Sequence, residues 1–293
     1  MADLPAPAVQ APGVYHHTLG EAVVTALNDG MFEGATALLT GIPANEAEGL
    51  LTGSFRPVPP RLSVNAYLIS MGGRRILVDT GCGTSFGPQM GAMARNLAAM
   101  GVTPDTIGTV LLTHGHPDHV GGLTDPDGKA AFPNAELVVA EKELAFWRDD
   151  AIMASVPEDS KGYFTGARAA FAAYAGRTRT VTEGEAAPGI VAIAEYGHTP
   201  GHTGYLISSG GQSLLIWGDI VHIPGVQFAR PEAGMVFDVD GGGAVSTRAR
   251  IFDMAASEKL LVAGMHLDFP CFGHVERRGT GYAHLPVVWS PWM

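Results

Sequence analysis

The segment Leu111–Gly122, "LLTHGHPDHVGG", contains four side chains of the kinds that bind metals within a span of six residues. They are His114, His116, Asp118 and His119, and they follow an apolar run typical of a buried strand. Side chains two residues apart in an extended chain point the same way, so His114 and His116 can approach one ion together. Asp118 and His119 point away from each other, which suits them to a second ion. Because burial without an ion would leave several polar groups to satisfy, the segment predicts a metal site.

Pro117 and two glycines fix the backbone of this segment. Pro117 removes a backbone donor and pushes His116 toward extended geometry, so a helix cannot begin before the histidines are placed. Gly121 and Gly122 allow a tight turn just beyond them.

The rest of the chain predicts strands clustered between helices. Hydrophobic residues make up 46% of the chain and charged residues only 16%, which suits a large core. We expect residues 1–20 to form an N-terminal arm, residues 31–61 to be rich in loops, and residues 21–293 to form a single domain of packed sheets covered by helices. Strands are expected at 23–30, 107–113, 135–140, 190–197 and 259–266, hairpins at 65–81 and 203–219, and helices at 88–100, 141–149, 160–176 and 244–258.

Three further ligand candidates end or follow apolar strands, as His114 does. His202 lies in "GHTPGHTGYL", Asp219 ends "SLLIWGD" and His266 ends "KLLVAGMH". The ends of neighbouring strands meet at one rim of a sheet, so these side chains are able to converge. Catalytic zinc usually takes three protein ligands and a water, which makes such a set chemically reasonable. His198, on the other side of the turn from His202, is interpreted as a residue that supports a metal ligand or as a structural one.

The order of these motifs resembles the metallo-β-lactamase superfamily. The likeness rests on T-H-x-H-x-D-H-x-G-G, then G-H-T-x-G-H-T, G-D and a late histidine, and runs from Leu77–Gly81 to Ala263–Pro270. "FGPQMG", "SKGYFTGA" and "GHVERRGTGY" are similar to the methyl parathion hydrolase-like and lactonase branch. The resemblance implies an αββα sandwich of two mixed β-sheets covered by helices, a dinuclear metal site and a homodimer.

The resemblance also implies a role for each candidate ligand. One ion would be held by His114, His116 and His202, and the other by Asp118, His119 and His266. Asp219 would bridge the two ions, and Asp79 would orient a ligand histidine, although a turn-capping role is an equal alternative.

Two divalent ions about 3.5–4 Å apart can share a hydroxide and lower the pKa of its parent water toward ~7. That hydroxide would be the nucleophile, with Asp118 or Asp219 handling the proton. Zinc suits these ligands best, and manganese, iron or cobalt also fit them.

The expected substrate pocket is aromatic, which favours small neutral apolar or aromatic esters. The resemblance places six residues in it: Phe86, Trp147, Tyr163, Phe164, His222 and Phe237. Ordinary core packing is the alternative for each aromatic residue. A histidine and a bulky Phe look more like lactone and aryl-ester hydrolases, so we expect lactones and aryl esters first, with organophosphate triesters as a side activity.

Several other functions stay open or are excluded. A net charge of −11 argues against a nucleic-acid partner. A dedicated organophosphate hydrolase and a non-catalytic metal-binding member of the fold are the main alternatives. A thioesterase or β-lactamase is disfavoured by the aromatic pocket, although Arg56, Arg61 and Arg230 leave the latter open. The start of the chain lacks a signal-peptide pattern and no apolar run approaches ~20 residues, so a cytoplasmic protein without a membrane span is expected.

Overall fold

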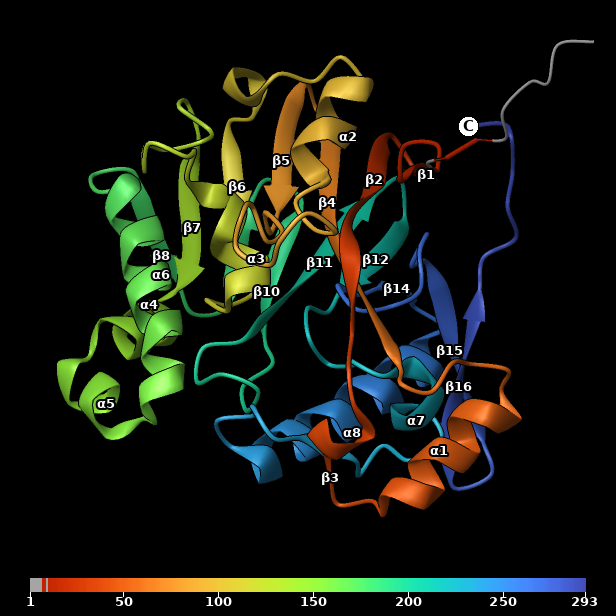
Figure 1. The fold of residues 1–293 in the computed structure, drawn as a ribbon. Helices are drawn as coiled ribbons and strands as arrows, with labels where there is room; N and C mark the ends of the chain where they lie inside the picture. The colour runs from red at the N-terminus through yellow and green to blue at the C-terminus, as the bar shows by residue number, and fades with distance from the viewer. Residues whose placement is uncertain (1–6, 9) are drawn as a thin grey trace, which may run out of the picture.

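The computed structural model describes residues 7–8 and 10–293, and two mixed seven-stranded sheets form its centre (Figure 1). The first sheet has the order β1-β2-β4-β5-β6-β7-β8: β1 Val14–Leu19, β2 Ala22–Glu33, β4 Arg61–Met71, β5 Arg74–Val78, β6 Thr109–Leu111, β7 Glu136–Ala140 and β8 Thr178–Val181. The strands from β5 to β8 run parallel to one another, and the earlier pairs are antiparallel.

The second sheet has the order β16-β15-β14-β12-β11-β10-β9, and within it only β12 and β14 pair in parallel. Its strands are β9 Gly184–Ala187, β10 Ile190–Ala194, β11 Thr203–Ser209, β12 Gln212–Ile216, β14 Leu261–Ala263, β15 Gly273–Arg278 and β16 Gly281–Pro286. A small antiparallel pair, β3 Leu39–Thr40 and β13 Gly234–Met235, lies apart from both sheets.

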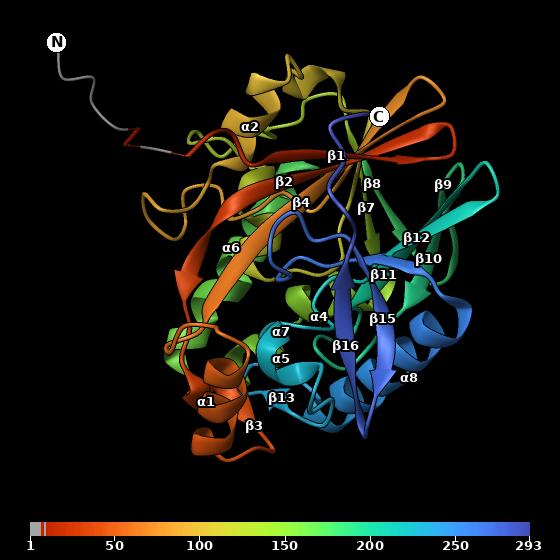
Figure 2. The ribbon, with the colours of Figure 1, turned by 90° about the vertical axis from the view of Figure 1, so that its right-hand side faces the viewer.

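Helices cover the outer faces of the two sheets (Figures 1 and 2). Those beside the first sheet are α2 Met93–Ala99, α3 Pro117–Val120, α4 Glu141–Arg148, α5 Asp150–Ser155 and α6 Lys161–Ala173. Those at the other side are α1 Ala44–Gly53, α7 Pro224–Gln227 and α8 Gly241–Glu258. Short 3₁₀ turns occupy Thr36–Leu38, Pro104–Thr106, Gly121–Leu123 and Glu158–Ser160. The arrangement confirms the expected αββα sandwich.

Alternating side chains of the first sheet build two separate apolar layers. In β4, Tyr67 and Ile69 pack between the sheets, whereas Ala66 and Leu68 pack outward beneath the helices. Period-two alternation is what a strand covered on both faces requires. The core lies between and outside the sheets, and the ends of the strands are left free to carry polar groups.

Three regions differ from the expected elements. Residues 14–19 of the expected arm form β1, which pairs with β2, while the start of the arm, residues 1–6 and 9, lies outside the described residues. The loop-rich region 31–61 contains the ten-residue helix α1. The C-terminal part forms the hairpin β15–β16. Among the described residues, no helix has both the length and the apolar character that a membrane crossing needs.

Candidate metal centre

The loop after β6 presents the histidine-rich segment at the rim of the first sheet. His116 has an extended backbone (φ −68°, ψ 154°) and directly precedes α3, whose first residue is Pro117. The turn beyond α3 packs tightly, since a Cβ on Gly121 would lie 2.3 Å from the carbonyl oxygen of Cys82. The helix therefore begins only after His116, as the proline predicts, and the glycine permits a close backbone contact.

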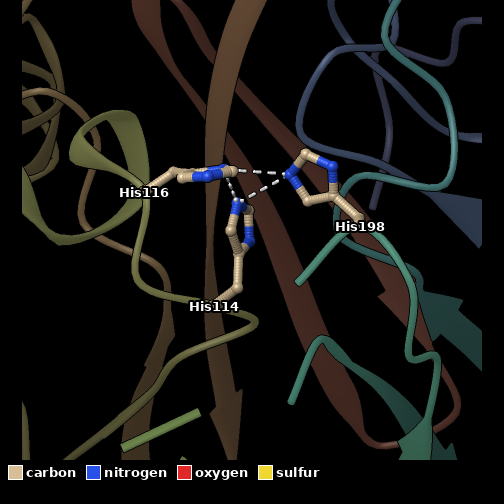
Figure 3. A group of neighbouring side chains, drawn as sticks. All are labelled: His114, His116 and His198. Carbon is tan, nitrogen blue, oxygen red and sulfur yellow. Dashed lines mark hydrogen bonds between the residues drawn. The ribbon is translucent and has the colours of Figure 1, made fainter. Parts of the chain in front are cut away.

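Three imidazoles converge in the first group of the centre, His114, His116 and His198 (Figure 3). His116 Nδ1 lies 3.0 Å from both His114 Nε2 and His198 Nε2, and the latter two atoms are 3.2 Å apart. Nitrogens bound tetrahedrally to one zinc ion at about 2.0–2.1 Å stand about 3.3–3.4 Å apart. The spacing of these three nitrogens therefore fits a single divalent ion.

A second group joins carboxylates with histidines. Asp118 Oδ2 lies 3.5 Å from Nε2 of both His119 and His266. Asp219 Oδ2 lies 3.3 Å from His119 Nε2 and 3.1 Å from His266 Nε2, and also 3.4 Å from His198 Nε2 of the first group. Asp219 therefore lies between the two groups, and each group has the nitrogen and oxygen donors of a divalent metal site.

The other ring nitrogen of several of these histidines already has a partner. His119 Nδ1 lies 2.7 Å from Asp79 Oδ2, and His198 Nδ1 lies 2.8 Å from Asp238 Oδ1. His266 Nδ1 lies 2.7 Å from the backbone oxygen of residue 63. Such contacts fix the tautomer and the ring orientation, and they leave Nε2 of each ring turned toward the centre.

The structure differs from the expected ligand set at His202. Its Nδ1 lies 2.9 Å from the backbone oxygen of Glu195, and its Nε2 accepts the backbone N–H of Asp219 at 2.9 Å. Both ring nitrogens are thus used within the protein, and it is His198 that faces His114 and His116. The sequence signal is two histidines on either side of a Pro-Gly turn, which does not indicate which one turns inward.

Burial sets the protonation of His114 and His116 in the first group. It lowers the pKa of His114 and of His116 well below the usual range. It also lowers the pKa of the neighbouring His222 to about 4. These rings are therefore neutral at pH 7 and offer lone pairs, the form that binds a metal.

In the second group, carboxylates and histidines shift one another's pKa values. Burial would raise the pKa of Asp219, yet His119 and other histidines hold it well below its usual range. Burial would likewise lower the pKa of His119, but Asp219, Asp118 and Asp79 raise it well above its ordinary value. Within the described residues, His119 Nε2 and Asp219 Oδ1 are buried without a hydrogen-bond partner. Three carboxylates and unused donor atoms fit the binding of divalent cations.

A cavity of about 240 Å³ opens onto both groups. Of the residues expected in the pocket, it is lined by Phe86, Tyr163, His222 and Phe237, and it also includes Phe32, Leu38 and Leu62, which sequence reasoning missed. Trp147 and Phe164 lie instead in the apolar core beneath it, where they are only 2% and 3% exposed. They line no part of the cavity because both pack into the apolar cluster beneath it, where the Trp147 ring lies behind His116 with ring centroids 5.5 Å apart.

These positions predict a large loss of stability for one Phe→Ala variant and almost none for another. Phe164→Ala is expected to lower the free energy of unfolding by about 3–5 kcal/mol, the usual cost of truncating a buried Phe. Phe86→Ala is expected to change stability by less than about 0.5 kcal/mol, because the ring is 43% exposed. Denaturant unfolding of the two variants measures the difference, and equal losses would contradict the assignment of Phe86 to the cavity wall.

Comparisons with known proteins agree with this arrangement. The model of the metallo-beta-lactamase superfamily matches residues 59–266. The crystal structure of AbOPH, a hydrolase of the beta-lactamase superfamily, is 35% identical with a TM-score of 0.92 and covers 96% of this chain and 100% of that one. AidC, a dizinc quorum-quenching lactonase in complex with its product, is 25% identical with a TM-score of 0.89, over 95% and 99% of the two chains.

A beta-lactamase-like protein 2 homolog from Drosophila melanogaster is 30% identical over 54% of this chain and 46% of its own length. The chain spans less than half the length of the curated relatives it matches. The family model and the similar hydrolase structures confirm a metal-dependent hydrolase with the expected fold, and the chain belongs to the metallo-β-lactamase superfamily.

Proposed function

We propose that this protein is a dinuclear metal-dependent hydrolase of lactones and aryl esters. One ion would be held by His114, His116 and His198, the other by Asp118, His119 and His266, with Asp219 between them. The observation that carries the proposal is the apolar cavity that opens directly onto both groups. In the part of the chain that the structure describes, none of the residues lining this cavity is Lys or Arg, which favours a neutral substrate over an anionic one.

Bound at these groups, two divalent ions would supply a nucleophile at neutral pH and a Lewis acid for the ester carbonyl. The protein's own contribution is to hold the substrate and to place the protons. Phe32, Phe86 and Phe237 provide apolar surface for an acyl or aryl group and exclude water from it. Asp118 and Asp219 also line the cavity, so they are the carboxylates available to hold a proton beside the reacting carbon.

One similarity and one feature of the cavity support lactones as the first substrate class. AidC, which aligns over almost the whole chain, is a lactonase whose structure holds a product, N-hexanoyl-L-homoserine. His222 and Phe237 both line the cavity and meet edge to face, with ring centroids 5.1 Å apart. An aromatic wall of this kind favours an apolar lactone or aryl ester. Residues 21–293 are proposed to act as one catalytic unit, and the expected homodimer stays a prediction that light scattering checks.

A substrate panel tests the proposal. We expect dihydrocoumarin to exceed a dimethyl aryl phosphotriester in kcat/KM by about 10- to 200-fold, the range over which apolar pockets discriminate. Elemental analysis should find about two metals per chain, and removal by a chelator should abolish turnover until metal is restored. The reverse ranking would favour a dedicated organophosphate hydrolase. No turnover of lactone, aryl ester, phosphotriester, thioester or β-lactam by metal-loaded protein would favour a non-catalytic member of the fold.

A further inference from the structure

Glu143 is a fully buried carboxylate of α4 whose two oxygens each bind a different loop. Oε1 accepts the backbone N–H of Gly115 at 2.8 Å and the indole N–H of Trp147 at 2.6 Å. Oε2 accepts the hydroxyl of Thr199 at 2.7 Å and the backbone N–H of Gly201 at 2.9 Å. Four donors match the roughly four lone-pair positions of an ionised carboxylate.

The two loops that Glu143 joins are the ones that carry the three-histidine group. Gly115 stands between His114 and His116, and Thr199 directly follows His198. The loops are far apart in sequence and belong to different sheets, since one follows β6 and the other joins β10 to β11. A contact that reaches both loops at once therefore bears on the distance between their histidines.

Close packing of both loops against α4 supports the same role. A Cβ on Gly115 would lie 2.3 Å from Trp147 Nε1, and a Cβ on Gly201 would lie 2.2 Å from the backbone nitrogen of Glu143. Neither position has room for a side chain, so each backbone rests directly on the helix. The hydrogen bonds of Glu143 then act over short, fixed distances, which is the condition under which an outer residue controls the geometry of a site.

We propose that Glu143 is a positioning residue that sets the separation of His198 from His114 and His116 by holding one loop with each carboxylate oxygen. This inference rests on the proposed function, because it takes those three histidines to hold one of the two ions. Among the described residues, the Glu143 carboxylate forms no hydrogen bond with Asp118, His119 or His266 of the second group. The effect of Glu143 is therefore expected first at the ion of the three-histidine group.

Glu143→Gln tests this role on the full-length, metal-loaded protein. The amide keeps the shape of the side chain and one acceptor oxygen. Its NH₂ group cannot accept a hydrogen bond, so the backbone N–H of either Gly115 or Gly201 loses its acceptor. We expect the affinity of one of the two ions to fall by about 10- to 100-fold, the usual effect of losing an outer partner of a metal ligand, while the other ion keeps wild-type affinity. Competition with a chelator measures both affinities, and the visible spectrum of the Co²⁺-substituted protein reports changed geometry at one ion.

Thr199→Val is the second variant, and it keeps the test informative if Glu143→Gln does not fold. It removes only the hydroxyl donor at Oε2 and leaves the shape of the side chain. A loss of about 2- to 10-fold in the affinity of the same ion is expected, the scale of one hydrogen bond. Glu195→Gln is the matched control. Glu195 is equally buried, but its carboxylate has no hydrogen-bond partner among the described residues, so wild-type affinity is expected for both ions.

Two results would overturn the role assigned to Glu143. One is wild-type affinity for both ions in Glu143→Gln and in Thr199→Val. The other is an equal loss of affinity for both ions that parallels the loss of stability. A purely structural defect would have that effect. Since the readout is metal affinity, a wild-type protein that binds two ions but hydrolyses no ester refutes the proposed function, while the comparison of variants still decides the role of Glu143.

Discussion

His198→Ala is expected to lose one metal ion and to lower hydrolysis by more than about 100-fold, whereas His202→Ala is expected to keep both ions. The reason lies in the direction of the two rings. His198 Nε2 stands 3.0 Å from His116 Nδ1 and 3.2 Å from His114 Nε2, so alanine there removes one of three converging nitrogens. Loss of a residue that only supports a metal ligand usually lowers activity by about 10- to 100-fold. Loss of a ligand itself should therefore lower hydrolysis by more.

His202 reaches the metal centre by a hydrogen bond to the backbone of Asp219. Its Nε2 accepts the N–H of Asp219 and its Nδ1 lies against the backbone of Glu195, so alanine there leaves a buried backbone donor unpaired. That loss costs about 1–3 kcal/mol of stability and shifts Asp219 without removing a donor to the metal. The expected outcome is a lowered midpoint of thermal unfolding with two ions retained.

Metal content and turnover of both variants, with His116→Ala as a matched member of the same group, measure the difference. His116→Ala should behave like His198→Ala, because the two rings share one site. The assignment is contradicted if His202→Ala loses an ion while His198→Ala keeps two. In that case the ligand set expected from the sequence, with His202 beside His114 and His116, would hold.

The orientation of these two histidine rings illustrates what a sequence pattern can determine. The spacing of His114 and His116 predicts a shared direction because both lie on one extended stretch with a proline after it. His198 and His202 are separated by Thr199-Pro200-Gly201, and the direction of each ring depends on the path of that turn. The path is set by contacts with α4, a distant segment, and no local rule describes those contacts.

The same distinction holds for the fold. The hairpin of β4 and β5 was predictable because two apolar runs flank Gly72 and Gly73. The strand β15 carries charged, exposed residues in "GHVERR", so its pairing with β14 and β16 in the folded protein, rather than its own pattern, makes it a strand. Helix α1 contains Gly49 and Gly53, which weaken its intrinsic helical signal.

The pocket was the part least determined by the sequence. Phe86 and Phe164 are both aromatic residues near the motif, yet the first borders the cavity and the second lies in the core. Leu38, from the region expected to be loop-rich, and Leu62, at the start of β4, complete the cavity wall. The lining residues come from segments spread between Phe32 and His266, and their convergence depends on tertiary packing rather than on any spacing in the chain.

Asp219→Ala is expected to abolish the binding of both ions and to lower hydrolysis by at least about 10²–10³-fold, the scale seen when a key electrostatic group is lost. Asp219 Oδ2 lies within 3.1–3.6 Å of five histidine nitrogens that belong to both groups and to His222. No other carboxylate oxygen among the described residues has this position. Without it, the two groups would lose the carboxylate that stands between them, and Asp118 alone would be left at the cavity to attract two cations.

The chain of Asp219→Ala should still fold, which separates the loss of metal from the loss of structure. Asp219 follows β12 at the rim of the sheet, and the apolar side chains of Leu214, Leu215 and Trp217 that anchor this strand are untouched. Asp219→Asn serves as the control for shape, because it keeps the volume and removes the charge, and it should also bind less than two ions. Circular dichroism, metal analysis and turnover of the three proteins check these outcomes.

If Asp219→Ala retained exactly one tightly bound ion and partial activity, Asp219 would serve a single ion and the two groups would work independently. If it retained both ions and full activity, the carboxylate would have no part in joining them, and the dinuclear centre proposed for this hydrolase would be wrong.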